Sequence, residues 1–410
     1  MLKKIASNTF AQLVAKFFGA GLTLITTYFT IRLAGLELYG DLTRILVLVA
    51  VGFTAIDFGL NAEGIRSSKN DSEMQQHVYK IILARIFLSL LVIGVLNLVI
   101  LALPGGYSSE VKSVFWLGSL AIIFQGLYTS GNSWFQYKLS YWKSTISVVI
   151  GSLVGTGLTL YYLRYSPTLP YLVLANTLGY LTMAICSICL LSLEFRSLRD
   201  FRRVIGTLQP ILLLIRRSLT LGLIIIASVI ASKIDTIILG VYRLSSEVGQ
   251  YGFAYRIFDV ILVLPVFVMN VIYPISMQES QQKYRAKLIS QTTKTLAIIG
   301  IFVAALLWIS SPLVNLVRPG MDLSSNVLRI LSLSLPLFYI TAPLMWNLIG
   351  QKKDKLVLGI YISGAVLNAN LNLLLIPSYG AIAAAINTGL TEGFLVLALL
   401  YFSHETTLKH

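Results

Sequence analysis

The sequence predicts an all-α polytopic membrane protein with about twelve transmembrane helices in two six-helix bundles. Three observations predict this class. Of the 410 residues, 56% are hydrophobic and 12% are charged, whereas soluble domains carry about 25% charged residues. Apolar stretches of membrane-crossing length recur along the whole chain. Two short motifs also occur once in each half, which predicts a pseudo-two-fold axis along the membrane normal.

Apolar windows of about 20 residues predict six spans in each half. The first six cover 9–33, 42–62, 81–103, 113–133, 144–163 and 169–193. The second six cover 219–241, 252–277, 294–317, 327–349, 356–376 and 381–402. We therefore expect an N-terminal bundle over 1–193, a basic cytoplasmic linker over 194–218 and a C-terminal bundle over 219–410.

Charge predicts the orientation in the membrane. With the N-terminus inside, the inner segments hold roughly 21 Lys and Arg residues and the outer loops roughly 5, a strong positive-inside bias. Both termini are therefore predicted to be cytoplasmic. The net charge of +15 is explained by this bias and does not indicate a nucleic-acid partner.

The repeat rests on two matches. Residues 39–45 and 251–257 both read Y-G-x-x-x-R-I at the predicted outer end of a span. The pair Asn176-Thr177 in the sixth span matches Asn387-Thr388 in the twelfth. An even number of spans in each half makes these repeats parallel, which is a transporter architecture.

Several chemical classes lack the residues that they need. No His stands with a paired carboxylate, and no glycine-rich phosphate loop is present. Cys186 and Cys189 form a CxxC without further ligands nearby, so we predict no metal site. The outer loops are short, whereas a glycan polymerase is expected to need larger ones. We therefore expect neither an enzyme nor a bound cofactor.

Ionisable residues within the predicted spans are the first candidates for function. A charge near the bilayer centre costs at least about 2.5–3.5 kcal/mol, so each needs a partner or a wet cavity. Asp235 is expected to pair with Arg256 or Lys233, and Arg256 with Asp259 on one helix face. The cations outnumber the acids, so a central cavity is predicted to be cationic. The ten residues are Lys16, Arg44, Arg85, Lys233, Arg256 and Arg329 with Asp57, Asp235, Asp259 and Glu392.

Polar residues at helical spacing are the second candidates. In lipid such stripes must face protein or water, so they indicate interhelical hydrogen bonds or the wall of a hydrophilic pathway. Amides and hydroxyls suit sugars, and Lys and Arg suit phosphate. The stripes are Asn8, Gln12 and Lys16; Gln125, Thr129, Asn132 and Gln136; Asn368 and Asn372; and Asn387 and Thr391.

Several segments resemble the oligosaccharide-lipid flippases of bacterial polysaccharide export (the O-antigen or Wzx type). These belong to the multidrug/oligosaccharidyl-lipid/polysaccharide (MOP) superfamily, so the resemblance implies a MATE-like fold. The resemblance covers nearly the whole chain, and its motifs indicate fold and broad function rather than one substrate. It rests on SKIDTIILG at 232–240, EVGQY at 247–251, AYRI at 254–257, Tyr273-Pro274, Gly35 with Tyr39-Gly40, DFGL at 57–60, and Asn372 with Pro377, Gly380-Ala381 and Ala384.

The resemblance implies that an undecaprenyl-pyrophosphate-linked oligosaccharide moves from the cytoplasmic to the outer leaflet by alternating access. On this reading Lys16, Arg85 and Lys233 contact the pyrophosphate or acidic sugars. Arg44 and Arg256 are quasi-equivalent gate or cavity residues, and Asn8, Gln12 and Gln125 line the cavity. Asp57, Asp235 and Asp259 hold the cations in place, while Asp57 and Glu392 are candidates for coupling to H⁺ or Na⁺.

The implied setting is lipopolysaccharide or other polysaccharide biosynthesis at the bacterial cytoplasmic (inner) membrane. The implied partners are the lipid-linked oligosaccharide, membrane lipid, a polysaccharide polymerase and a chain-length regulator, with no nucleic acid. Three alternatives stay open: a flippase of lipid II or teichoic-type precursors, a multidrug/cation antiporter, and a membrane-embedded glycan polymerase. The first also moves an anionic lipid-linked saccharide. Drug exporters are expected to place acids in the cavity, whereas the first span here offers Lys16.

Overall fold

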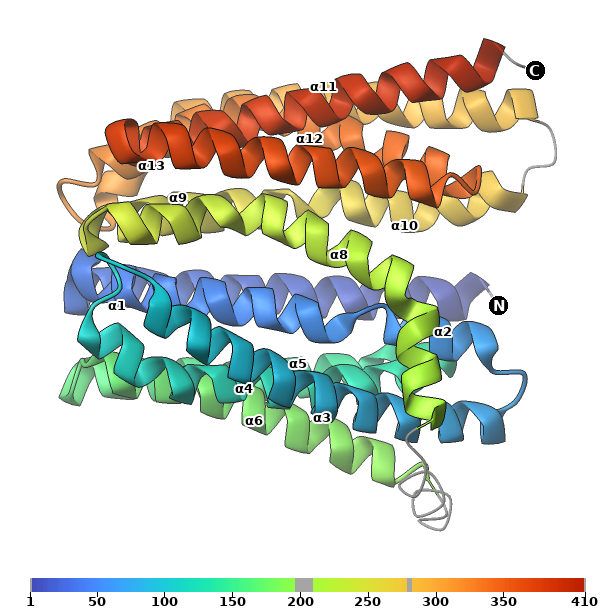
Figure 1. Cartoon of the computed structure of the whole chain (residues 1–410), viewed down its shortest axis with the longest axis horizontal. Coiled ribbons are helices and arrows are strands. Elements are labelled where there is room, and N and C mark those ends of the chain that lie inside the picture. Colours follow the sequence, from blue (N-terminus) through green and yellow to red (C-terminus); the bar gives the residue numbers. More distant parts are fainter. Residues whose placement is uncertain (1, 196–208, 279–281, 409–410) are drawn as a thin grey trace. The chain divides into compact units, whose positions relative to one another are not determined.

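The computed structural model describes residues 2–195, 209–278 and 282–408. Within these ranges every regular element is a helix, with twelve α-helices and one short 3₁₀ helix. The chain divides into two compact units, Met1–Ile226 and Ala227–His410. In Figure 1 the helices of both units are coloured along the sequence, from blue at the N-terminus to red at the C-terminus.

The first unit contains six complete helices and the beginning of a seventh. They are α1 (Leu2–Asp57), α2 (Leu60–Ser67), α3 (Asp71–Ala102), α4 (Ser109–Tyr137), α5 (Tyr141–Tyr165), α6 (Leu169–Ser192) and the start of α8 (Gln209–Tyr242). In this unit α5 packs on α6 and α1, and α4 packs on α3 and α6.

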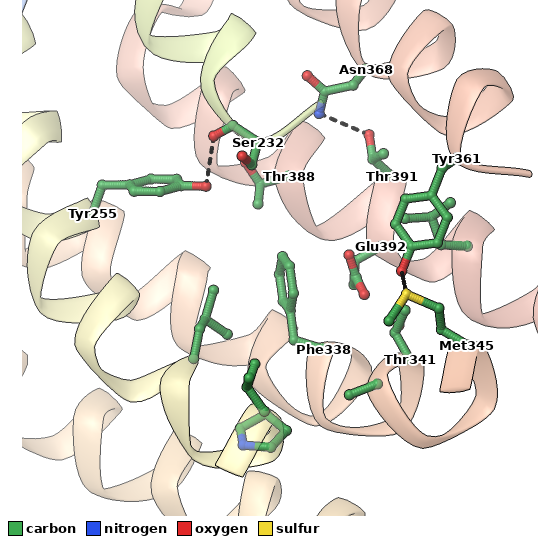
Figure 2. A pocket seen from close by; sticks show the side chains of 15 residues that line it. Ser232, Tyr255, Phe338, Thr341, Met345, Tyr361, Asn368, Thr388, Thr391 and Glu392 are labelled. Atoms are coloured by element: carbon green, nitrogen blue, oxygen red, sulfur yellow. Dashed lines mark hydrogen bonds between the residues drawn. The ribbon is translucent and has the colours of Figure 1, made fainter. Parts of the chain in front are cut away.

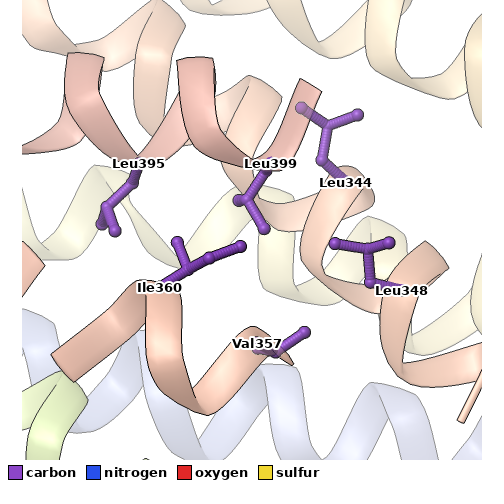
Figure 3. Packing of buried hydrophobic residues seen from close by; sticks show 6 residues of the cluster. All are labelled: Leu344, Leu348, Val357, Ile360, Leu395 and Leu399. Atoms are coloured by element: carbon purple, nitrogen blue, oxygen red, sulfur yellow. The ribbon is translucent and has the colours of Figure 1, made fainter. Parts of the chain in front are cut away.

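The second unit contains the remainder of α8 and the other helices. They are α9 (Ser245–Ile261), α10 (Val263–Gln278), α11 (Gln282–Ser310), η1 (Ser311–Leu316), α12 (Asp322–Gly350) and α13 (Asp354–Leu408). Helix α12 packs against α9, α10, α11 and α13. Six buried aliphatic side chains of α12 and α13 form one such contact (Figure 3) and are Leu344, Leu348, Val357, Ile360, Leu395 and Leu399.

The helices account for the twelve predicted spans. Nine stretches in the described residues are long and apolar enough to cross a membrane. A straight helix of 56 residues, the length of α1, would extend about 84 Å, far beyond the roughly 30 Å hydrocarbon core. Helix α1 is instead broken at Gly35 and α13 at Gly380. Each therefore supplies two spans, and α8 covers the predicted span 219–241, so the predicted fold class is confirmed.

Large apolar side chains lie exposed along the outsides of the helices. Leu98 is 69% exposed, Ile298 68% and Leu374 73%. A soluble protein rarely exposes extensive apolar surface of this kind, so lipid is the solvent that these faces require.

The predicted linker 194–218 lies mostly outside the described residues. Its last part, from Gln209, is helical and belongs to the start of α8. Ile211 and Leu214 of this part pack on Leu60 and Ile81 of the first unit. The division between the units falls within α8, eight residues beyond the predicted end of the linker at residue 218.

Candidate functional site

A fully hydrogen-bonded arginine, Arg85 of α3, holds the joint between α1 and α2. Phe58 and Gly59 both adopt positive φ there, 47° and 68°, which ends one helix and starts the next. The break frees the last carbonyl groups of α1 from the regular helical pattern. Arg85 of α3 donates from Nε to the Ile56 carbonyl (3.3 Å) and from Nη2 to the Asp57 carbonyl (3.5 Å).

Arg85 donates its remaining N–H groups to side chains. Nη2 donates to Asp57 Oδ1 (2.8 Å), and Nη1 donates to Asn61 Oδ1 (2.9 Å) and Ser130 Oγ (3.3 Å). A guanidinium has five N–H donors, and all five have protein acceptors. Because Arg85 is also only 1% exposed, it acts in this structure as a clamp on the helix break and offers no donor to a substrate.

Arg44 is held in a similar way. It is buried, forms an ion pair with Asp41 (2.7 Å) one turn earlier on α1, and lies over the Tyr107 ring at 5.8 Å. Its matched residue in the second half, Arg256, is only partly buried. The repeated motif therefore places its two arginines in different surroundings.

The polar stripe of the first span is only partly described. Lys16 is exposed and Gln12 partly exposed, while the Asn8 side chain lies outside the part of the chain that the structure describes. On α4, Gln125 is partly buried, and its Oε1 has no hydrogen-bond partner within the described residues. These positions stay predicted cavity residues.

In the second unit, Lys233 of α8 pairs with Asp259 of α9 (Nζ to Oδ2, 2.9 Å). The ammonium also lies over the Tyr255 ring at 4.5 Å. The expected pairing of Arg256 with Asp259 is therefore replaced by one across two helices. Within the described residues Arg256 makes no ion pair.

Asp235 differs from Asp57 and Asp259 because hydroxyl groups, not a cation, surround it. Tyr251 of α9 donates to its Oδ2, and Thr388 of α13 donates to the same oxygen (3.3 Å). Thr236 donates its backbone N–H to Oδ1 (2.5 Å). The expected ion pairs with Lys233 and Arg256 are not among the contacts of this buried carboxylate in the described residues.

Beside Asp235, the predicted polar stripes of α13 form a chain of amides. Asn387 donates to Asn372 (3.0 Å), Asn372 to Asn368 (2.6 Å), and Asn368 to Thr391 Oγ1 (3.0 Å). These residues come from both sides of the break at Gly380. The stripes thus join the two halves of α13 through buried hydrogen bonds.

A partly open cavity of about 280 Å³ lies next to this chain, among α8, α9, α10, α12 and α13 (Figure 2). Among the described residues that line it, Glu392 is the only Asp, Glu, Lys, Arg or His, and it is 5% exposed. Thr341 lies within hydrogen-bonding reach of this carboxylate, but its hydroxyl donates to the Leu337 carbonyl (3.0 Å). Glu392 Oε1 has no partner within the described residues.

Sequence reasoning misses the residues that complete these sites. Tyr251 and Thr388 stand out only as parts of the repeated motifs, and Tyr361, Phe338 and Met345 have no polar spacing to mark them. The sequence signal that could have found Tyr251 and Thr388 is that both belong to matched motifs, which lie far apart in the sequence. Their contact with Asp235 depends on the packing of three helices.

Comparisons with known proteins identify a matching family and similar structures. A family model described as "Polysaccharide biosynthesis protein" matches residues 5–278. No curated protein sequence matches the chain.

Solved membrane transporters are similar in fold. The lipid II flippase MurJ in an inward closed conformation superposes with a TM-score of 0.73 at 16% identity, over 95% of this chain and 87% of that one. An inward-facing multidrug resistance MATE family transporter of the MOP superfamily gives 0.75 at 14% identity, over 94% and 95%. A mutant of the Vibrio cholerae MATE transporter VcmN gives 0.64 at 13% identity, over 99% and 97%.

Proposed function

Because this chain belongs to the polysaccharide biosynthesis protein family, as the match over residues 5–278 shows, we propose that it is a flippase for a lipid-linked oligosaccharide. The substrate is an undecaprenyl-pyrophosphate-linked repeat unit of O-antigen or another polysaccharide, moved from the cytoplasmic to the outer leaflet. The family match is the observation that carries this proposal. The MurJ-like and MATE-like fold supports it, because both are folds of transporters.

Burial and ion pairing support a choice among the predicted cations. Arg85 and Arg44 are buried and engaged with protein groups, so they hold the first unit together. Lys16 is exposed and Lys233 is partly exposed. A pyrophosphate carries compact negative charge that an ammonium group can approach as a point charge. We therefore place substrate contact at Lys16 and Lys233, with Arg256 as a further cavity residue.

Energy for transport has two sources on this proposal. An anion leaving an inside-negative cell gains about 2.3 kcal/mol per charge per 100 mV. Alternatively H⁺ or Na⁺ enters in exchange, with Asp57 or Glu392 as the coupling acid. Transport into vesicles separates these sources: valinomycin with K⁺ removes the potential, and nigericin removes the proton gradient.

The proposal also fixes the setting. The chain works in the bacterial inner membrane with both termini cytoplasmic. It delivers repeat units to a polysaccharide polymerase and a chain-length regulator, and it catalyses no bond-breaking step itself.

The test is complementation in the host with labelled glycolipids. Deleting the gene should cause lipid-linked oligosaccharide to accumulate inside, and the wild-type chain should restore surface glycan. Lys16→Ala should restore less than about a tenth of it at a normal protein level, since a tenfold loss corresponds to roughly 1.4 kcal/mol of lost interaction. Lys112→Ala, in a predicted outer loop, is the matched control and should restore it fully.

Two further variants separate substrate contact from packing. Lys233→Ala leaves Asp259 without its cation, and the double variant Lys233→Ala/Asp259→Ala removes that unpaired acid. The double variant should therefore stay inactive if Lys233 contacts substrate, and should regain export if Lys233 only neutralises Asp259. Arg85→Ala should lower the amount of folded protein instead. If deletion leaves surface glycan unchanged, the oligosaccharide proposal fails and a lipid II or teichoic-type precursor becomes the next substrate to test.

A further inference from the structure

Arg329 of α12 is a cation within a predicted span that pairs with no acid in the described residues. Its Nε donates to Ser311 Oγ at the start of η1 (2.8 Å), and this is its only hydrogen bond to a described residue. Arg85 and Lys233, in contrast, each pair with a carboxylate. The charge of Arg329 is therefore left for a group outside the described protein to compensate.

Two buried serines fix the direction of this guanidinium. The Ser311 hydroxyl donates to the Trp308 carbonyl (2.9 Å), and Ser325, one turn before Arg329 on α12, donates to Ser311 Oγ (3.3 Å). Nε of Arg329 is thereby held on the protein side. A guanidinium has five N–H donors, and those on Nη1 and Nη2 have no acceptor in the described residues although neither atom is buried.

The surface around Arg329 changes from polar to apolar within two turns of α12. Asn326, on the turn before, is exposed, and Leu333, on the turn after, is 62% exposed. Trp308 of α11 is 44% exposed, and Cζ of Arg329 lies 6.0 Å from the centroid of its ring. Tryptophan is typical of the headgroup level of a bilayer. We therefore place Arg329 at the boundary between headgroups and acyl chains.

The acid in the first turn of α12 is engaged elsewhere. Asp322 accepts a hydrogen bond from Asn315 (2.9 Å). It also stands two turns before Arg329, about 10 Å along the helix axis, which is longer than the screening length of about 8 Å at physiological salt. Asp322 therefore leaves most of the Arg329 charge uncompensated.

The geometry suits the phosphate of a lipid. A guanidinium with two open Nη groups can bind two phosphate oxygens through parallel hydrogen bonds. Contact with the Trp308 ring attracts the charge but satisfies no N–H group. Leu333, one turn further into the membrane, offers apolar surface to an acyl chain. A headgroup with a net negative charge is favoured over a zwitterionic one, because it compensates Arg329 without bringing an ammonium group beside it.

We propose that Arg329 and Trp308, positioned by Ser311, form a binding site for the phosphate of an anionic phospholipid. The site lies on the lipid-facing surface of α11 and α12, at the end of the second unit that is predicted to face outward. It goes beyond the proposed transport of oligosaccharide, because it assigns the chain a second ligand that stays in the bilayer.

The test counts the lipids that the purified full-length protein retains in a neutral detergent, by native mass spectrometry. The lipids are phosphatidylglycerol and phosphatidylcholine with identical acyl chains. Basic segments elsewhere in the chain also attract anionic lipid, so the readout is the difference between variants. Arg329→Gln should retain one phosphatidylglycerol fewer than wild type and as much phosphatidylcholine. Arg329→Lys should restore part of the loss, because an ammonium keeps the charge but not the bidentate geometry.

Arg164→Gln is the matched control. Arg164 also lies beside an exposed ring, that of Tyr165 (5.7 Å from Cζ to centroid), at the predicted outer end of a helix. No described hydroxyl holds its guanidinium, so this variant should retain as much phosphatidylglycerol as wild type. Trp308→Leu changes an exposed side chain and should weaken retention severalfold, which still decides if Arg329→Gln does not fold.

Three results overturn the proposal. The first is equal retention of phosphatidylglycerol by wild type, Arg329→Gln and Trp308→Leu. The second is an equal loss of both lipids in the variants, which would mean that acyl chains alone are bound. The third is displacement of the phosphatidylglycerol by equimolar farnesyl pyrophosphate, which would make Arg329 part of the substrate path. No oligosaccharide is present in this assay, so its outcome is independent of the export test.

Discussion

At the residue scale, two arrangements compensate charged side chains within the described spans. Arg85 and Lys233 each have a carboxylate within 3 Å, at Asp57 and Asp259 respectively. Asp235 is instead surrounded by hydroxyl and N–H donors. Both arrangements compensate a charge within a span, but only the first is expected from counting charges along a sequence.

Gly380 is the residue whose replacement the structure constrains most clearly. It has φ 59° and ψ −139° at the break in α13, a region that side-chain-bearing residues avoid. A Cβ there would lie 2.0 Å from Glu247 Oε1 and 3.0 Å from Arg243 Nε. The Glu247 carboxylate accepts from the Ala381 amide (2.8 Å). The Arg243 guanidinium donates to the Ile376 carbonyl (3.2 Å).

We therefore expect Gly380→Ala to lower the free energy of unfolding by about 1–3 kcal/mol from backbone strain. The measurement is the thermal midpoint of the purified protein. Gly359→Ala is the control on the same helix, because a Cβ there meets nothing within 4 Å, and it should be neutral or slightly stabilising. Equal midpoints for the two variants would contradict the strain argument.

At the element scale, helix contact in the first unit depends on missing side chains. On α5, Gly151 and Gly155 stand four residues apart and face Gly179 of α6. A Cβ at Gly151 would lie 2.7 Å from the Gly179 carbonyl oxygen and 2.7 Å from Met183 Cβ. Small residues at this spacing allow helices in membranes to approach closely.

Gly151→Ala should therefore push α5 and α6 apart and destabilise the protein by about 1–3 kcal/mol, as overpacking does. The measurement is again thermal stability, with protein yield as a second readout. Gly157→Ala, further along α5 with open space at its Cβ, should leave both unchanged. A stable Gly151→Ala protein would mean that the two helices separate at little cost.

At the scale of the whole molecule, orientation in the membrane is the untested prediction. Positive-inside bias places residue 72 inside and residue 168 outside. In a background with Cys186→Ser and Cys189→Ser, a membrane-impermeant maleimide should label Thr168→Cys in intact cells. It should label Ser72→Cys only after permeabilisation. Both positions are exposed in the structure, so the reverse pattern would invert the topology.

The number of spans and the family resemblance are readable from the sequence because both depend on local patterns. Apolar length determines a span without reference to its neighbours. The motifs around Asp235, Tyr251 and Asn372 lie within single segments. The breaks at Gly35 and Gly380 likewise coincide with gaps between predicted spans.

Apart from Asp41 and Arg44, which pair within one helix, the partners of the charges are decided by tertiary structure. Arg85 carries the same charge and the same apolar flanks whether it binds a pyrophosphate or clamps a helix break, and only the position of Ile56, Asp57 and Ser130 around it distinguishes the two. Glu392 gives no sign in the sequence that aromatic rings from α12 and α13 surround it. The sequence determines which charged residues lie within spans, because this depends only on their positions along the chain. What each charge contacts depends on helix packing, because the contacting residues lie tens to hundreds of positions apart.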